Sequence, residues 1–284
     1  SGRSEKLLDV ASVNFIMSWL GYLIAGLVLV LAYLFYLDTT PEEQQVYLDR
    51  MAEGTTEARE KYSMLSRTAF IVGFTGEVGK ELVKEVVRSP RPFSKVVLIG
   101  RRKVEFDDDR KELEQKVVDF EKLNAEDLKG FDVGFIALGT TRGKSGAEGF
   151  YKVDHDYVMN VAKLAKEGGT TEMHLVSSVG ADKKSSFLYQ KTKGEVEEEM
   201  TDLNFNKLGI YRPGVLLCDR EETRVGERII RGLFKPISYF TTSGSIQTSL
   251  VAKAMVNYAV SQTTEKVEIF GNNALHVLAG NKKK

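Results

Sequence analysis

Two serines, a tyrosine and a lysine in the second half of the chain could carry acid–base chemistry. Ser177 and Ser178 end an apolar run that is typical of a strand, and Tyr189 stands four positions before Lys193. Residues four apart share one face of a helix, so the ammonium group would lie near the phenol. A neighbouring positive charge lowers the pKa of a phenol and prepares it to exchange a proton. We therefore expect Ser178, Tyr189 and Lys193 to form a catalytic set in which the serine holds a substrate carbonyl, although a tyrosine and a lysine at this spacing also occur on ordinary helix surfaces.

A glycine-rich turn follows the first expected strand of the same region. Three glycines stand at intervals of three residues, directly after the apolar run 68–73 and at the start of a helical segment. Glycine allows a sharp turn and a close approach of the backbone to a ligand, and the free amides at a helix start attract phosphate. This setting predicts a turn that binds the pyrophosphate of a dinucleotide, with a plain strand–helix turn as the alternative. The residues expected to make these contacts are Gly73, Thr75, Gly76, Glu77, Val78 and Gly79.

Two arginines at the end of the second expected strand bear on which dinucleotide would bind. Folds that bind NAD usually carry an acidic residue there for the ribose 2′-hydroxyl, whereas a basic side chain suits the 2′-phosphate of NADP(H). Arg101 and Arg102 therefore favour NADP(H) as the cofactor, with a solvated basic turn as the alternative. Further cofactor contacts are expected at Asp119 (the adenine amino group, at the end of the third strand), at Leu138, Gly139 and Thr140 (the end of the fourth strand), and at Tyr189 and Lys193.

These residues need a scaffold that brings the ends of separate strands together. From Ser66 onward, apolar runs alternate with amphipathic stretches, which predicts an α/β domain with a doubly wound, parallel sheet of the Rossmann type. The expected strands are 68–73, 95–100, 115–119, 133–138, 173–177, 208–212 and 266–270. The expected helices are 77–88, 125–129, 150–167, 186–202, 222–233 and 247–260.

An uncharged segment lies ahead of this domain. No charged residue occurs between Ala11 and Leu37, and the 20 residues from Ser18 to Leu37 would span roughly 30 Å as a helix, the thickness of a bilayer core. We expect one transmembrane helix, with a buried hairpin helix or an uncleaved signal peptide as alternatives. The expected division is 1–38 for the segment with the transmembrane helix, 39–66 for a juxtamembrane helix or linker, and 67–284 for the NADP(H)-binding domain.

Flanking charges and the first residues bear on which membrane would hold this helix. Arg3 and Lys6 lie close before the apolar segment, which by the positive-inside rule would place the domain away from the usual NADP(H) pool. The expected cofactor argues for the opposite orientation, and we give it more weight. The chain begins with Ser-Gly rather than Met, through either a cloning remnant or the removal of a presequence. Removal of a presequence favours the mitochondrial inner membrane over the endoplasmic reticulum.

Charge and composition exclude some classes of function. The 40 basic and 40 acidic residues leave no net charge, so nothing selects nucleic acid as a partner. A single cysteine, Cys218, rules out an intrachain disulfide and a multi-cysteine metal site. The three histidines, at positions 155, 174 and 276, are far apart and lack the spacing of metal ligands, so we expect no metal site.

Longer strings in the chain resemble one family of the atypical short-chain dehydrogenases/reductases, the Tat-interacting-protein type of oxidoreductase. The similarity runs from about Ala69 to Asp219 and is most specific at 98–103, 139–144, 146–150, 180–183, 187–189, 193–196 and 212–220. The resemblance implies a Rossmann domain that binds NADPH through the glycine turn and the two arginines, and a Ser178, Tyr189 and Lys193 constellation. Two departures stand out. Residues 1–66 have no counterpart in the soluble family pattern, and Phe74 and Thr75 stand where smaller residues are usual.

Two functions remain open on these grounds. The first, which we favour because Tyr189 and Lys193 are intact, is a membrane-tethered NADPH-dependent reductase in which Tyr189 protonates a carbonyl oxygen. Its partners would be the lipid bilayer and a small carbonyl substrate. The second is a non-catalytic scaffold or accessory subunit that retains NADP(H) among the subunits of a membrane complex, for example a mitochondrial respiratory complex.

Overall fold

The structure is a computed structural model, and it describes residues 55–106, 108–140, 142–217 and 244–281. The expected transmembrane segment, Cys218 and the expected helix 222–233 lie outside the described residues. Within them, no helix combines the length and the apolar character that crossing a membrane requires.

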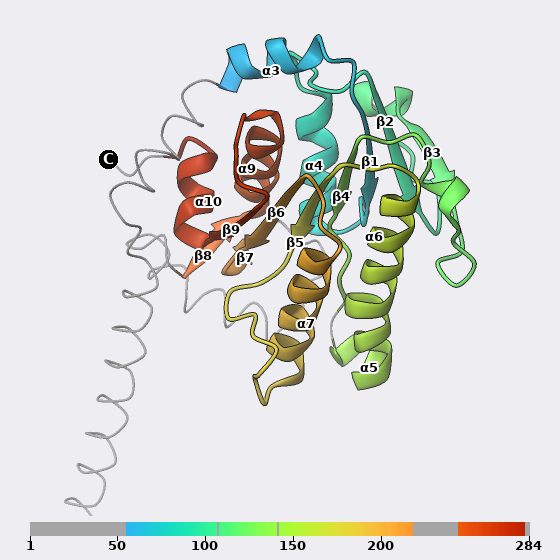
Figure 1. Cartoon of the computed structure of the whole chain (residues 1–284), viewed down its shortest axis with the longest axis vertical. Coiled ribbons are helices and arrows are strands. Elements are labelled where there is room, and N and C mark those ends of the chain that lie inside the picture. Colours follow the sequence, from blue (N-terminus) through green and yellow to red (C-terminus); the bar gives the residue numbers. More distant parts are fainter. Residues whose placement is uncertain (1–54, 107, 141, 218–243, 282–284) are drawn as a thin grey trace, which may run out of the picture. The chain divides into compact units, whose positions relative to one another are not determined.

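In the described part of the chain, seven strands form one sheet in the order β3-β2-β1-β4-β5-β6-β9 (Figure 1), and every neighbouring pair is parallel. The strands are β1 (Thr68–Val72), β2 (Lys95–Gly100), β3 (Glu114–Val117), β4 (Val133–Ile136), β5 (Glu172–Val176), β6 (Lys207–Arg212) and β9 (Val267–Gly271). The order changes direction between β1 and β4, which is the switch point at which such sheets bind ligands. The predicted Rossmann-type parallel sheet is therefore confirmed.

Strand β1 carries the core on both of its faces. Ala69 and Ile71 are buried in the cluster on one face, and Phe70 and Val72 in the cluster on the other, because successive side chains of a strand point to opposite faces. Helices α4 (Glu77–Val87), α9 (Thr248–Val260) and α10 (Asn272–Leu278) contribute to the first cluster, and α6 (Tyr157–Glu167) and α7 (Leu188–Asp202) to the second. Cover on both faces explains why the central strands are continuous apolar runs in the sequence.

Several expected elements differ in detail from the observed ones. The single helix expected at 150–167 is α5 (Arg142–Tyr151), a π-helical turn (Lys152–Asp156) and α6 in succession. The helix expected at 125–129 is a 3₁₀ turn (Ala125–Asp127), and a second 3₁₀ turn occupies Asp109–Glu112. Helix α10 and the short paired strands β7 (Val215–Leu217) and β8 (Ser245–Gln247) were not expected. Segments this short offer too few apolar repeats for a sequence pattern to detect.

Helix α3 (Thr55–Ser63), within the stretch expected to be a juxtamembrane helix or linker, packs against the domain. Arg59 is buried, and its guanidinium donates to Glu85 Oε1 at 2.6 Å and to the Pro90 carbonyl at 3.1 Å. The ring of Tyr62 meets that of Phe93 edge-on, with centroids 5.7 Å apart. Residues 55–63 therefore share the core of the sheet, while the boundary at residue 66 stays a prediction.

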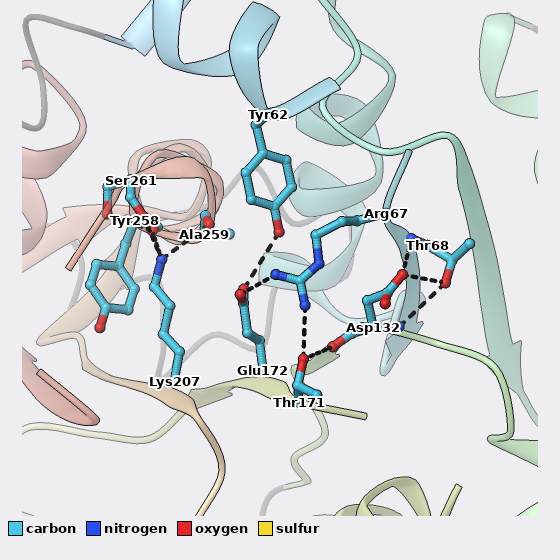
Figure 2. Close-up of polar contacts among 10 residues, drawn as sticks. All are labelled: Tyr62, Arg67, Thr68, Asp132, Thr171, Glu172, Lys207, Tyr258, Ala259 and Ser261. Atoms are coloured by element: carbon cyan, nitrogen blue, oxygen red, sulfur yellow. Dashed lines mark hydrogen bonds and ion pairs between the residues drawn. The ribbon is translucent and has the colours of Figure 1, made fainter. Parts of the chain in front are cut away.

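A polar network lies at the amino ends of the central strands, at the edge opposite the expected cofactor site (Figure 2). Glu172, the first residue of β5, accepts hydrogen bonds from the guanidinium of Arg67 and, at 3.4 Å, from the hydroxyl of Tyr62. Asp132, just before β4, accepts from the backbone N–H of Thr68 at 2.7 Å and from its hydroxyl at 3.0 Å. These contacts join α3 to the starts of β1, β4 and β5.

Lys207, the first residue of β6, is a buried cation at the same edge. Its ammonium donates to the carbonyls of Tyr258, Ala259 and Ser261 at 2.7, 3.1 and 2.7 Å, and so caps the end of α9 (Figure 2), where helix geometry leaves carbonyls without partners. Burial lowers the pKa of Lys207 to about 8, and the charges of Glu172 and Glu268 oppose this shift only in part.

The lowered pKa of Lys207 should make the stability of the protein rise between pH of about 8 and 10.5. In that window the unfolded chain still holds a proton that the folded protein has lost, because the ordinary lysine pKa is 10.5. The gain should reach up to about 3 kcal/mol, at roughly 1.4 kcal/mol per pKa unit. The measurement is the free energy of unfolding in urea for wild type minus that for Lys207→Met, at several pH values. A difference that stays flat or falls across the window would contradict the assignment.

Candidate functional site

The carboxyl ends of β1, β4 and β5 lie side by side in the sheet and bring three predicted segments together. The glycine turn follows β1, residues 137–140 follow β4, and Ser177 and Ser178 follow β5. The backbones of the first two segments are in close contact, because a Cβ on Gly73 would lie 2.4 Å from the carbonyl oxygen of Ala137. The candidate site is centred on this contact.

The glycine turn is shaped so that two of its positions admit no side chain. Gly73 has a φ of +86°, in the region that favours glycine. A Cβ on Gly79 would lie 2.1 Å from the carbonyl oxygen of Gly73, and the N–H of Gly76 donates to that same carbonyl at 2.9 Å. The turn leads directly into α4, whose first amides have no partner within the helix. A bare backbone next to a helix start is the geometry that binds phosphate.

The remaining residues of the turn have different environments. Thr75 is exposed, whereas Val78 is buried in the core and can offer a ligand only its backbone. Glu77 opens α4 and lies 3.8 Å from the ammonium of Lys80. The ring of Phe74, unusual at its position, is buried against Gly100, where a Cβ would come within 2.6 Å of it. Phe74 therefore packs into the core below the turn.

Arg101 and Arg102 follow β2 as expected, and both side chains are exposed. Neither guanidinium has a hydrogen bond or an ion pair within the described ranges. Asp119 does not close the third strand as predicted, because β3 ends at Val117. Its Oδ1 accepts from the N–H of Glu121 at 3.0 Å and thereby shapes the loop after β3.

Lys193 is held by a partner that sequence reasoning missed. Its Nζ lies 2.9 Å from Oδ1 of Asp154, and both side chains are almost fully buried. The other oxygen of this carboxylate accepts from the N–H of Thr140 at 2.7 Å. Asp154 thus joins α7, the π-helical turn and the loop after β4. Next to Thr140, Gly139 is exposed, and a Cβ on it would lie 3.5 Å from Asp154 Oδ1; Leu138 is half-buried. The sequence signal that could have identified Asp154 is an acidic residue within the apolar pattern of the expected helix 150–167.

Tyr189 and Ser178 lie on the elements that the sequence predicted. Tyr189 is in the first turn of α7, is 43% exposed, and its ring centroid lies 5.7 Å from that of Phe150. The Ser178 hydroxyl donates to the carbonyl of Val179 at 3.3 Å. In the part of the chain that the structure covers, no hydrogen bond joins Ser178, Tyr189 and Lys193 to one another.

A second buried acid, Glu197, braces the same helix and was also missed. It accepts from the hydroxyl of Ser177 and from Nε of Arg212 at 3.0 Å, and a second nitrogen of Arg212 binds its other oxygen. The guanidinium of Arg212 is two-thirds covered and is neutralised by this contact. Glu197 therefore ties α7 to the ends of β5 and β6, so the strand end that carries Ser178 and the helix that carries Tyr189 are fixed together.

The arrangement can bind a phosphorylated, dinucleotide-like ligand and can present a phenol, a hydroxyl and an ammonium to a neighbouring group. Among the described residues, no cluster of three or more His, Cys, Asp and Glu side chains could hold a metal ion.

Comparison with known proteins places the chain in a family. No family model matches it. Protein HTATIP2 of Rattus norvegicus is 48% identical over 221 residues, which cover 76% of this chain and 91% of that protein. The mitochondrial protein FMP52 of Candida albicans is 34% identical over 234 residues, or 75% of this chain and 98% of that protein.

Solved structures of low sequence identity share the fold. MoeE5 in complex with UDP-glucuronic acid and NAD has a TM-score of 0.56 at 17% identity, covering 72% of this chain and 75% of its own. UDP-N-acetylglucosamine 4-epimerase from Bacillus cereus has a TM-score of 0.53 at 15% identity, covering 72% and 77%. These structures share the Rossmann-type parallel sheet of this chain. Since nearly half of the aligned residues match a relative over nine-tenths of its length, the chain belongs to the HTATIP2 family.

Proposed function

We propose that the protein is an NADP(H)-binding oxidoreductase that reduces a carbonyl substrate, with Tyr189 as the proton donor. The observation that carries the proposal is the side-chain-free cradle at Gly73 and Gly79, where a Cβ would overlap the backbone at 2.4 and 2.1 Å. A cradle of this kind at the switch point of a parallel sheet suits the diphosphate of a dinucleotide. Gly73, Gly76 and Gly79 would hold that diphosphate.

The choice of NADP(H) over NAD(H) rests on the basic residues that follow β2. Arg101 and Arg102 are exposed and have no ion pair within the described residues, so their charges are available to a phosphate. Lys103 adds a third exposed cation directly after them. Charge-assisted hydrogen bonds from arginine to phosphate are among the strongest polar contacts in proteins. A 2′-phosphate between these side chains accounts for the basic pair, which a free ribose hydroxyl does not.

The chemistry assigned to the chain is proton transfer to a carbonyl oxygen. The bound nicotinamide supplies the hydride that reduces the carbonyl carbon. Ser178 donates a hydrogen bond to the carbonyl oxygen and holds it in place. Tyr189, exposed at the start of α7, gives its proton to that oxygen. Lys193, one helical turn further along, supports the phenolate that remains, while Asp154 holds the ammonium in place.

One experiment tests binding and chemistry together. NADPH and NADH affinities are measured by calorimetry, and NADPH oxidation is followed with a panel of ketones and aldehydes. The double substitution Arg101→Ala with Arg102→Ala should lower the affinity for NADPH at least about tenfold, because only NADPH carries the 2′-phosphate. The affinity for NADH should stay nearly unchanged. Lys129→Ala, which removes an exposed charge at the opposite ends of the strands, is the matched control. Tyr189→Phe should keep the NADPH affinity and lose turnover about a hundredfold.

A non-catalytic scaffold that retains NADP(H) is the second candidate. The observation in its favour is that Lys193 pairs with Asp154 and not with the hydroxyl of Tyr189. The same experiment separates the two. If the wild-type protein binds NADPH but oxidises it with none of the ketones and aldehydes tested, the scaffold replaces the reductase as the proposed function. Failure to bind either dinucleotide would remove both.

We also propose that residues 18–37 anchor the protein in the mitochondrial inner membrane. The support is the uncharged run of 20 residues together with relatives in Candida albicans and Aspergillus niger that are named mitochondrial. A membrane tether suits a lipophilic substrate or the subunits of a membrane complex.

Two charges in the centre of this segment should abolish anchoring. An arginine at the centre of a membrane helix costs about 3 kcal/mol, so Leu27→Arg with Leu29→Arg should release the full chain from liposomes during alkaline extraction. Leu27→Ala with Leu29→Ala, which adds no charge, should stay in the membrane fraction with wild type. Extraction of the wild type, or retention of the arginine variant, would contradict the anchor.

A further inference from the structure

The π-helical turn, residues Lys152–Asp156, enters the chemistry described so far only through Asp154. The N–H of Tyr157 donates to the carbonyl of Lys152, five residues earlier, which defines the turn. Such turns are rare in proteins, but those that occur are often found at functional sites. Here the turn lies between the loop after β3 and helix α7. On the first side, the ammonium of Lys152 lies 2.5 Å from Glu121, and the ring of Tyr157 stacks on Phe120.

On the second side, two successive residues of the turn contact α7. Asp154 binds Lys193, and the side chain of the next residue, His155, lies against Glu199, which is six residues further along the same helix. Nε2 of His155 is 2.9 Å from Glu199 Oε1, and Nδ1 is 2.8 Å from Asp156 Oδ1. The side chain of His155 is only 12% exposed.

This geometry requires the imidazolium form of His155. A carboxylate only accepts hydrogen bonds, and a neutral imidazole has one nitrogen that also only accepts. With a carboxylate oxygen at each nitrogen, the neutral ring would set two acceptors against each other at hydrogen-bond distance. Burial by itself lowers the pKa of His155, but the hydrogen bonds and charges of Asp156 and Glu199 outweigh it and raise the pKa above the usual value.

The surroundings of His155 supply few other charges. Within the described residues, the charged groups in contact with it are Asp156 on its own turn and Glu199 on α7. Nζ of Lys163 on α6 lies 3.9 Å from the second oxygen of Glu199, and the phenol of Tyr151 donates a hydrogen bond to Glu195 on α7. From α5, the ring of Tyr151 stacks on the imidazole with centroids 4.5 Å apart, and burial raises the pKa of that phenol, so it is neutral at physiological pH. Loss of the His155 proton would therefore leave the two carboxylates facing a neutral ring.

We propose that protonated His155 is a positioning residue for the cofactor site. It clamps the π-helical turn onto α7, and the turn in that position holds Asp154 against Lys193 and against the N–H of Thr140. Deprotonation releases one of the two contacts of His155, so Asp154 moves away from its two partners. The proposal rests on the proposed function in one respect: the loop at Thr140 and Lys193 are taken as parts of the NADP(H) site. Cofactor affinity is then highest below the pKa of His155 and falls as the pH rises through it.

The coupling can be measured without any cofactor. The chain has three histidines, so the imidazole signals in an NMR titration of the full chain are few, and His155→Gln identifies the one of interest. The amide proton of Thr140 reports on its hydrogen bond to Asp154. It should titrate with the pKa of His155 in wild type and lose this transition in His155→Gln. Glu199→Gln should lower the pKa of His155, whereas Glu198→Gln, at the exposed neighbouring position, should leave it unchanged.

The consequence for the cofactor is measured as NADPH affinity against pH. In wild type the affinity should fall about tenfold across the His155 transition, the effect of losing one charge-assisted hydrogen bond. His155→Gln should bind with the weaker affinity throughout, and His155→Arg, which keeps a charge with several donors, should keep the tighter affinity without the transition. The inference would be overturned if the chemical shift of the Thr140 amide did not change as His155 titrates. It would also be overturned if the NADPH affinity of the wild type stayed constant across that transition. Absence of NADPH binding at every pH, with the Thr140 transition present, would overturn the proposed function and the cofactor part of the inference while leaving the clamp.

Discussion

The contact between the carboxyl ends of β1 and β4 is the constraint on which the site depends. The carbonyls of Ala137 and Gly73 occupy the space that a Cβ at positions 73 and 79 would need. Only glycine at both positions lets the chain leave β1, turn at once and begin α4 at the switch point of the sheet. The outcome is a patch of bare backbone at a helix start, with the loop that carries Thr140 directly beside it.

Charged residues are arranged differently at the amino ends and at the carboxyl ends of the strands. At the amino edge, Arg67 pairs with Glu172 and Lys207 caps α9, as expected where an unpaired buried charge would cost several kcal/mol. These contacts hold the strand starts and α3 together. At the carboxyl edge, buried charges are also paired, as Lys193 is with Asp154, but Arg101 and Arg102 stay exposed without an ion pair among the described residues. The charged residues at the amino ends thus stabilise the fold, and those proposed to bind the cofactor lie at the carboxyl ends.

The parts of this picture that follow chain order could be predicted from the sequence. Apolar runs indicated the positions of the seven sheet strands that the described residues contain, and the glycine spacing marked the turn between β1 and α4. The contacts of Asp154, Glu197 and His155 were not predicted, because each joins residues far apart in the sequence and depends on how helices pack. The π-helical turn was missed because one extra residue in a helix hardly alters an apolar pattern over so short a stretch. Asp119 was assigned to a strand end, whereas its carboxylate shapes the loop beyond it.

Backbone amide shifts during a titration with NADPH test the central claim most directly, since they report on the turn itself and need no substrate. In ¹H–¹⁵N spectra of the full chain, the largest changes should fall on the amides of the glycine turn and the first turn of α4, residues 73–79, and on the loop at Thr140. Amides at the amino edge, around Glu172 and Lys207, should stay unchanged. Shifts that spare residues 73–79, or that concentrate at the amino edge, would contradict the claim that this backbone cradle holds a dinucleotide.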